Sequence, residues 1–222
     1  AGVLFFFEIL PVLDAQTADP INVVTTAVPF LRISPDARAG GMGDVGIATS
    51  ADAGAGFWNI GKVAFNESKG GLAATYTPWL KNLVNDVYLA SLSGYYKIDE
   101  TSALNASLRY FSLGNIQFTD QNGTLNGNGK PREFGFDIGY SRKLSDKLGL
   151  GVALRYINSD LANGAASGAN TYKAGTSVAG DIGFYYHGLN EAGDGFAFGV
   201  ALTNLGSKIS YTGNADNKDY IP

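Results

Sequence analysis

The sequence of 222 residues has no cysteine and a single histidine, and charged residues make up only 16% of it. The absence of cysteine excludes disulfide bonds, thiolate metal sites and cysteine nucleophiles. With one histidine and no H-E-x-x-H segment, almost no ligand set for zinc is available, so we expect neither a metal nor another cofactor. The net charge is −4, and the sequence contains no block of basic residues. Both features argue against nucleic acid as a partner.

Long apolar runs are also missing, because no segment approaches the roughly 20 residues that a transmembrane helix needs. The N-terminal residues 1–16 contain a short apolar stretch followed by Asp14-Ala15-Gln16. This pattern is typical of the end of a secretory signal segment, and we expect residues 1–16 to be a remnant of one. An apolar N-terminal arm of the mature protein is the alternative. If the protein lies in a membrane, it crosses it with strands.

What the sequence does contain is 30 glycines, 12% aromatic residues and a repeated alternation of side chains. From Leu72 onward, seven segments alternate apolar residues with small or polar ones, and a turn follows each. Successive side chains of a strand point to opposite faces, so each segment has one apolar face and one that accepts Arg, Asp and Gly. The alternation predicts strands over residues 72–79, 86–98, 102–113, 133–143, 147–157, 175–187 and 195–204.

The connections between these segments sort into two lengths. The short links are residues 98–101, 144–146 and 188–194, and the long links are residues 114–132 and 158–174, with residues 80–85 on the side of the long ones. Aromatic residues gather near both ends of the predicted strands, as expected for rings at two membrane interfaces. Both features are typical of an outer-membrane barrel with short periplasmic turns and long extracellular loops. We therefore predict an all-β fold, a transmembrane antiparallel β-barrel.

Four charged residues stand on the parity that should face the inside of this barrel. They are Arg109, Asp137, Arg155 and Asp181, one on each of four consecutive strands. Because strand direction alternates, these side chains should lie at comparable heights, and their signs run plus, minus, plus, minus. Opposite charges on neighbouring strands stabilise the pairing. We predict a charge ladder inside the lumen that braces the wall, with a transport or ligand role as the alternative.

Two motifs that often carry chemistry are present without their context. Residues 41–46 match G-x-G-x-x-G, but no strand precedes them and no parallel βαβ unit is visible, so a tight turn is the better interpretation. His187, the only histidine, stands at a strand end beside Tyr185 and Tyr186, and the carboxylates are scattered rather than paired. We find no enzyme site. A hydrolase with an activated serine near His187 is the remaining catalytic possibility.

The segment Ser34–Ser50, followed by Phe57-Trp58-Asn59, resembles the PorV family of the Bacteroidetes type IX secretion system, within the wider group of FadL-like barrels. Residues 20–31 and 198–206 are similar to that family as well. The resemblance implies a fourteen-stranded barrel with an N-terminal hatch inside the lumen. Residues 17–70 would then be the hatch, with short helical turns near residues 36–42 and 60–65. Residues 71–222 would be the wall, with about seven strands in this chain and the C-terminal part of the barrel missing.

The hatch residues that the resemblance singles out are Asp36, Arg38, Gly41, Gly43, Asp44, Phe57, Trp58 and Asn59. The family usually reads Trp-Asn-Pro-Ala at the end of this stretch, whereas Ile60 and Gly61 follow Asn59 here.

The resemblance implies a non-enzymatic protein of the outer membrane of a Gram-negative Bacteroidetes bacterium. Its implied partners are the SprA translocon barrel, secreted proteins bound through their C-terminal signal domain, a surface attachment complex and outer-membrane lipid. We expect the long loops to meet the protein partners through Gln117, Asp120, Asn122, Asn126 and Arg132. The alternative function is a FadL-like transporter of hydrophobic small molecules, whose path Phe30, Leu31, Phe57 and Trp58 would line.

Overall fold

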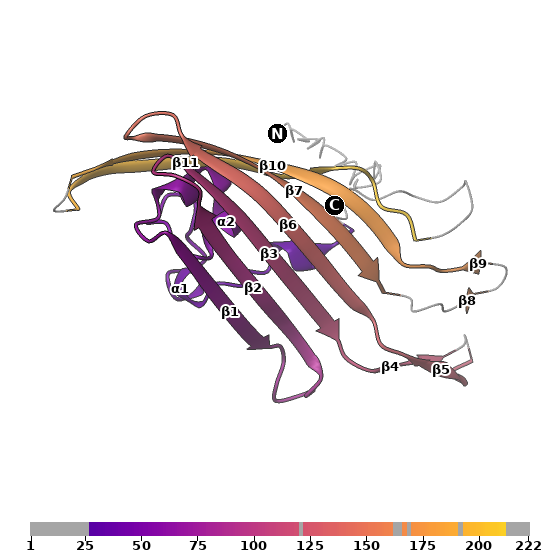
Figure 1. The fold of residues 1–222 in the computed structure, drawn as a ribbon. Coiled ribbons are helices and arrows are strands. Elements are labelled where there is room, and N and C mark those ends of the chain that lie inside the picture. Colours follow the sequence, from indigo (N-terminus) through magenta and orange to yellow (C-terminus); the bar gives the residue numbers. More distant parts are fainter. Residues whose placement is uncertain (1–26, 120–121, 162–165, 168–169, 191–192, 212–222) are drawn as a thin grey trace, which may run out of the picture.

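In the computed structural model, the described residues are 27–119, 122–161, 166–167, 170–190 and 193–211. The expected signal remnant, residues 1–16, and the loop residue Asp120 lie outside them. The described chain forms one curved antiparallel sheet, and the N-terminal segment, residues 27–66, lies on the inner side of its curve (Figure 1). Among the described residues, no helix is long and apolar enough to cross a membrane.

The sheet contains seven strands in the order of the sequence, each antiparallel to its neighbours. They are β1 (Gly70–Pro78), β2 (Val87–Lys97), β3 (Ser102–Leu113), β6 (Arg132–Lys143), β7 (Leu148–Asp160), β10 (Gly175–Leu189) and β11 (Gly195–Gly206). All seven predicted strands and their up-and-down order are thus confirmed. The sheet is not closed into a barrel within this chain, because β1 and β11 stand at its two edges.

The long links contain two small hairpins that the sequence did not predict. In the first, β4 (Ile116–Thr119) pairs with β5 (Leu125–Gly129), and in the second, β8 (Ala166–Ser167) pairs with β9 (Asn170–Thr171). These strands have two to five residues each, too few for a periodic pattern to stand out in the sequence. In the first hairpin Gly123 and Gly127 adopt φ angles of 81° and 110°, which glycine reaches without a steric penalty.

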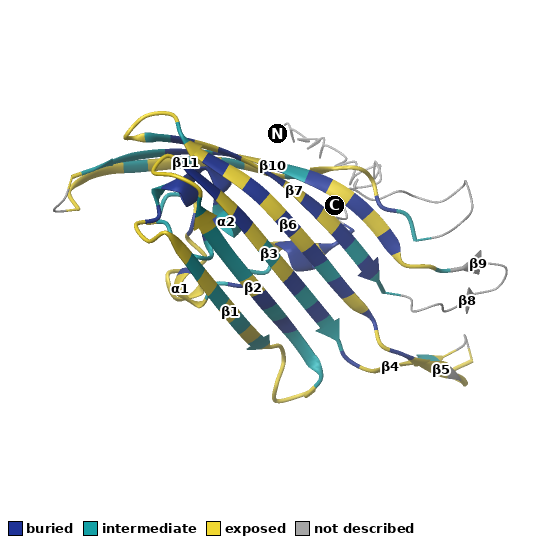
Figure 2. Cartoon of the chain, in the orientation of Figure 1, coloured by how far each residue is buried: buried dark blue, intermediate teal, exposed yellow. Residues whose placement is uncertain are grey.

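The two faces of the sheet differ in what they meet. Along β6 and β7, every second residue is buried and most of the residues between are exposed, as the bands in Figure 2 show. We call the face against the N-terminal segment the covered face and the other the outward face. The exposed residues of the outward face are mostly large and apolar, and they include Leu92, Leu104, Leu108, Phe136, Ile138, Val152, Leu154, Ile182, Val200 and Leu202.

Aromatic rings border this apolar face at both ends of the strands. Near the long links, the rings of Tyr88 and Tyr110 are 6.1 Å apart, and those of Phe134 and Tyr156 are also 6.1 Å apart. Near the short turns stand the exposed rings of Tyr96, Tyr140, Phe196 and Phe198. Phe134 and Tyr140 are both in β6 and about 20 Å apart along the strand, at roughly 3.3 Å per residue.

The N-terminal segment consists of short helical turns. These are η1 (Pro29–Arg32), α1 (Ala37–Gly41), α2 (Ala55–Trp58) and η2 (Ile60–Phe65). A proline opens η1, and the carboxylate of Asp36 caps α1 by accepting from the backbone N–H of Arg38 at 2.9 Å. The amide oxygen of Asn59 caps η2 in the same way, accepting from Gly61 N at 3.0 Å. The helical turns predicted near residues 36–42 and 60–65 are confirmed, whereas η1 and α2 had no recognised signal.

The apolar core lies between this segment and the covered face, in two clusters. One joins Val28, Phe30 and Leu31 to the wall residues Leu89, Phe111, Ile157 and Ala179. The other joins Ala55, Ile60, Val63 and Ala64 to Ala103 and Ala153. The N-terminal segment therefore supplies half of the core.

Candidate functional site on the covered face

The charge ladder crosses the covered face at mid-height. Arg109 on β3, Asp137 on β6, Arg155 on β7 and Asp181 on β10 are each at most 5% exposed. Arg109 Nη2 lies 3.4 Å from Asp137 Oδ2, and Arg155 Nη2 lies 2.8 Å from Asp181 Oδ2. Arg155 Nε also pairs with Asp137 Oδ1, so salt bridges join all four side chains. Removing one partner from such a buried network typically costs about 3–5 kcal/mol, since a charge is left unpaired.

Two further residues complete the ladder: Ser107, which shares the inward parity of Arg109, and Asn204, which the sequence did not indicate. Ser107 Oγ donates to Asp137 Oδ2 at 2.7 Å, and the backbone N–H of Asn204 donates to Asp181 Oδ1 at 2.7 Å. Arg155 Nη1 also donates to the Asn204 amide oxygen. Asn204 reaches this position because the pairing of β10 with β11 shifts register at this point and Asn204 has a φ of 60°. Strict alternation cannot indicate a residue displaced by a bulge.

The ladder also holds the N-terminal segment. Arg109 Nη1 donates to the backbone oxygen of Leu31 at 3.1 Å. The same guanidinium lies 5.1 Å from the ring centroid of Phe57, within the range of a cation–π contact. Phe57 in turn packs edge-on against Trp58, with 4.9 Å between ring centroids. Two of the predicted hatch residues are thus connected to the ladder.

The other predicted hatch residues lie in two places. Asp36, Arg38, Gly41, Gly43 and Asp44 form α1 and the turn after it, away from the ladder. Arg38 bridges Asp52 at 2.9 Å and Ser50 Oγ at 2.7 Å, which closes the loop that follows α1. The G-x-G-x-x-G match spans this turn, and the described residues before it, 27–40, contain no strand.

Asn59 instead lies against the sheet and is 1% exposed. Its side-chain nitrogen donates to the backbone oxygen of Phe184 on β10 at 2.8 Å and to that of Ile47 at 3.2 Å. The residue thus connects η2, the loop before α2 and the wall.

Lys62 in η2 is a buried cation that the sequence did not single out. It is 1% exposed, and its Nζ donates to Thr49 Oγ1 at 3.1 Å and to the backbone oxygen of Gly46. Burial lowers the pKa of Lys62 to about 8, while the carboxylate of Asp52 opposes that shift. The ammonium group holds the loop at residues 46–49 against η2.

The five loop residues predicted to contact partners lie on the link between β3 and β6. Gln117 is exposed on β4, Asn122 is exposed in the turn between β4 and β5, and Arg132 is exposed where β6 begins. Asn126 belongs to β5, and Asp120 lies outside the described residues. The four described residues stand at the end of the sheet opposite the short turns, and the role of all five as partner contacts stays a prediction.

His187 stands near the short-turn end of β10. Its Nδ1 lies 3.2 Å from the hydroxyl of Tyr185, and its ring centroid is 5.6 Å from that of Phe65. The histidine is therefore packed among aromatic rings, and its imidazole ring pairs with the hydroxyl of a tyrosine. Within the described ranges, no group of three His, Cys, Asp or Glu residues could hold a metal ion.

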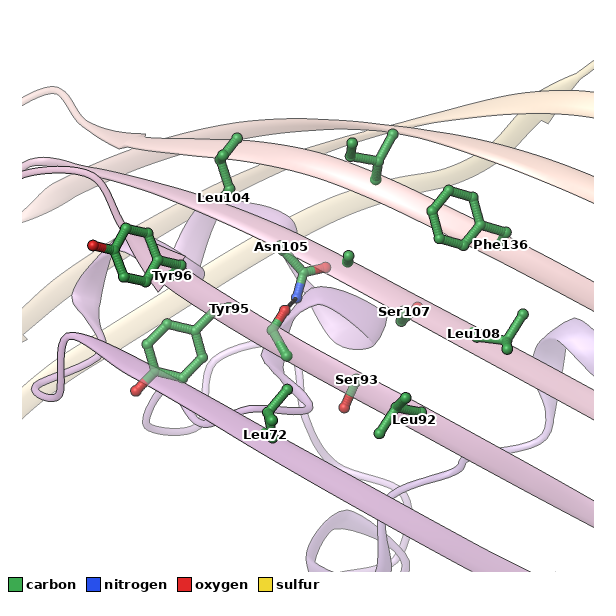
Figure 3. A pocket seen from close by; sticks show the side chains of 13 residues that line it. Leu72, Leu92, Ser93, Tyr95, Tyr96, Leu104, Asn105, Ser107, Leu108 and Phe136 are labelled. Atoms are coloured by element: carbon green, nitrogen blue, oxygen red, sulfur yellow. Dashed lines mark hydrogen bonds between the residues drawn. The ribbon is translucent and has the colours of Figure 1, made fainter.

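Hollows adjoin the sheet in several places. A cavity of about 250 Å³ lies between the N-terminal segment and β11, lined among others by Leu31, Phe57, Trp58, Arg155 and Asn204. A groove of about 410 Å³ crosses β1, β2, β3 and β6, and Figure 3 shows Leu72, Leu92, Leu104, Leu108 and Phe136 among the residues that line it. This groove exists because Gly94 and Ala106 are register partners flanked by larger residues.

A family model described as type IX secretion system protein PorV matches residues 15–222. No curated protein matches the sequence. The matched range includes the N-terminal segment, the charge ladder and all seven strands of the sheet.

Proposed function

Since the matched model covers residues 15–222, the chain belongs to the PorV family of type IX secretion system proteins, and from this premise we propose that it is a non-enzymatic outer-membrane component of that system. Membership implies a role in type IX secretion. The family match is the observation that carries the proposal, and the two faces of the sheet support its membrane part.

The outward face supports a position in lipid. A row of exposed apolar side chains bounded at both ends by aromatic rings is the pattern of a membrane-spanning wall. The covered face, with its buried charges, would then line the interior. We propose that the sheet is part of the wall of a closed FadL-like barrel of fourteen strands, with residues 71–222 contributing wall. Residues 17–70 would be the hatch and residues 1–16 the signal remnant.

The long links are where we expect the protein partners to bind. Gln117, Asn122 and Arg132 are exposed at the end of the sheet that would face the outside of the cell. We propose that this rim, with Asp120 and Asn126, contacts the SprA translocon barrel and secreted proteins bound through their C-terminal signal domain. From there the cargo would be released or passed to the surface attachment complex.

Deletion of the gene tests the proposal directly. We expect loss of type IX secretion or of surface anchoring, with recovery on complementation. Gln117→Ala combined with Arg132→Ala should reduce co-purification with SprA and with cargo, whereas Lys147→Ala in a short turn serves as the matched exposed control. Normal secretion and anchoring in the deletion strain would overturn the proposal.

A FadL-like transporter of hydrophobic small molecules is the second candidate. The cavity of about 250 Å³ beside Phe57 and Trp58 favours it. A hydrophobic ligand found in the purified protein, together with intact secretion in the deletion strain, would support transport instead.

A further inference from the structure

Where the N-terminal segment touches the covered face, several wall residues are glycines and have no side chain. Glycines stand on four neighbouring strands there: Gly139 on β6, Gly149 and Gly151 on β7, Gly183 on β10 and Gly199 on β11. A Cβ at Gly151 would lie 2.7 Å from the carbonyl carbon of Ile60, and one at Gly183 would lie 2.8 Å from Gly61 N. Since such distances are too short for real Cβ contacts, the backbone of η2 lies directly on the backbone of the wall.

Hydrogen bonds fasten this contact from both sides. Ser141 Oγ on β6 donates to the backbone oxygen of Gly61 at 3.2 Å and accepts from Ala64 N at 3.1 Å. The side chain of Asn59 donates to the backbone oxygen of Phe184, and the side chain of Arg109 donates to that of Leu31. Undocking would leave buried polar groups unpaired and would separate both apolar clusters, so each lost bond would oppose the movement.

A second strip of chain packs beside the N-terminal segment at the long-link end of the wall. After β11, residues 207–211 return to the covered face, where Ile209 is completely buried in the cluster of Val28 and Phe30. The Tyr211 hydroxyl donates to the backbone oxygen of Ala27 at 3.1 Å and to Ser159 Oγ at 2.9 Å. This strip therefore packs against both the wall and the start of the N-terminal segment.

A gate that opens is drawn from parts of a protein with few buried contacts and low local stability. The parts of residues 27–66 that touch the wall, residues 27–31 and 55–66, have the opposite properties, because most of them are buried. We propose that this segment is a fixed layer of the wall that stays docked during secretion, so that cargo and small molecules do not pass along the covered face. Cargo is then handled at the outer rim and outside surface. The inference rests on the proposed role in secretion.

These 222 residues contain no cysteine, so two cysteines introduced among them have no other thiol within this part of the chain to pair with. Gly56 in α2 and Asn105 in β3 suit the purpose, since a Cβ at Gly56 would lie 2.6 Å from Asn105 Cγ. A cysteine sulfur at position 105 would take about the place of that Cγ, within reach of a disulfide. Gly56→Cys with Asn105→Cys therefore locks the segment to the wall, and Ala64→Cys with Ser141→Cys is a second lock at η2.

The experiment compares secretion by each double variant of the full-length protein under oxidising conditions and after reduction. Bond formation is followed by gel mobility, and the four single-cysteine variants are the controls. We expect both locked proteins to secrete cargo as well as their single-cysteine controls, with no change on reduction. Loss of secretion that reductant restores would overturn the inference, as would failure of both bonds to form. Failure of the proposed function is distinct, because it appears as normal secretion after gene deletion.

Discussion

Leu154 and Arg155 are neighbours in β7, yet the leucine is 63% exposed and the arginine is 4% exposed. The same inversion runs across the sheet, where apolar side chains fill the outward face and the charge ladder lies buried on the covered face. In a protein surrounded by water the burial of these two residue types would be the reverse. The difference supports the proposal that the outward face meets an apolar medium, and on the covered face the N-terminal segment supplies the backbone oxygen of Leu31 to Arg109.

The largest effect should come from breaking the centre of the ladder. Arg155→Met leaves Asp137 and Asp181 buried without their common partner, so we expect a loss of about 3–5 kcal/mol in the free energy of unfolding. Urea unfolding of the purified protein in detergent measures it. Arg132→Met, at an exposed position of β6, is the control and should cost little. A similar small loss for both variants would mean that the ladder does not brace the wall.

The outward face gives the next largest effect. Leu154→Arg puts a charge among the apolar residues of β7, and in lipid this costs about 2–4 kcal/mol at the bilayer midplane. Leu125→Arg is matched in exposure, because Leu125 is 64% exposed on the β4–β5 hairpin, and should cost almost nothing. Unfolding in lipid vesicles separates the two variants. Equal stabilities would contradict the placement of this face in lipid.

Contact between the N-terminal segment and the wall is tested at a glycine. In Gly151→Ala the new Cβ meets the backbone of Ile60, and such crowding typically costs about 1–3 kcal/mol. Limited proteolysis should then cut residues 27–66 faster. Gly180→Ala is the control, since its Cβ would lie 3.7 Å from the nearest atom. Unchanged proteolysis of the Gly151 variant would show that η2 is not held against β7.

The smallest effect concerns Lys62 and depends on pH. Its pKa is about 8 in the folded protein and 10.5 when unperturbed, so between these values the unfolded chain binds more protons. The stability of the fold should therefore rise with pH, by about 1 kcal/mol from pH 8 to pH 9. Lys62→Met should lack this rise in parallel unfolding experiments. Identical pH slopes for the two proteins would show that Lys62 is not desolvated as described.

Much of the wall was predictable, because alternation is a local property. The alternation in Phe134-Gly135-Phe136-Asp137 is enough to predict which side chains share a face. The same alternation indicated the four charged residues that salt bridges join. The hydrogen-bond partners of these charges were harder to predict from the sequence. Leu31 contributes a backbone oxygen, which carries no residue-type signal, and Asn204 depends on a bulge.

The packing of the N-terminal segment was beyond any local pattern. In the sequence, Gly151 and Gly183 look like ordinary small residues in a strand. Only the structure shows that a Cβ at either position would collide with the backbone of Ile60 and Gly61. Lys62 reads as a solvated cation, yet it is buried against the loop at residues 46–49. Both features join residues far apart in the chain.

By itself, the sequence determined the seven strands, their order and the chemistry of the two faces, since a period of two residues leaves no other assignment. Only the tertiary structure decided which wall residues the N-terminal segment contacts, and that glycines let the two backbones touch. The physical reason is that hydrogen bonding and packing between distant segments depend on three-dimensional proximity, which the periodicity of one strand does not encode.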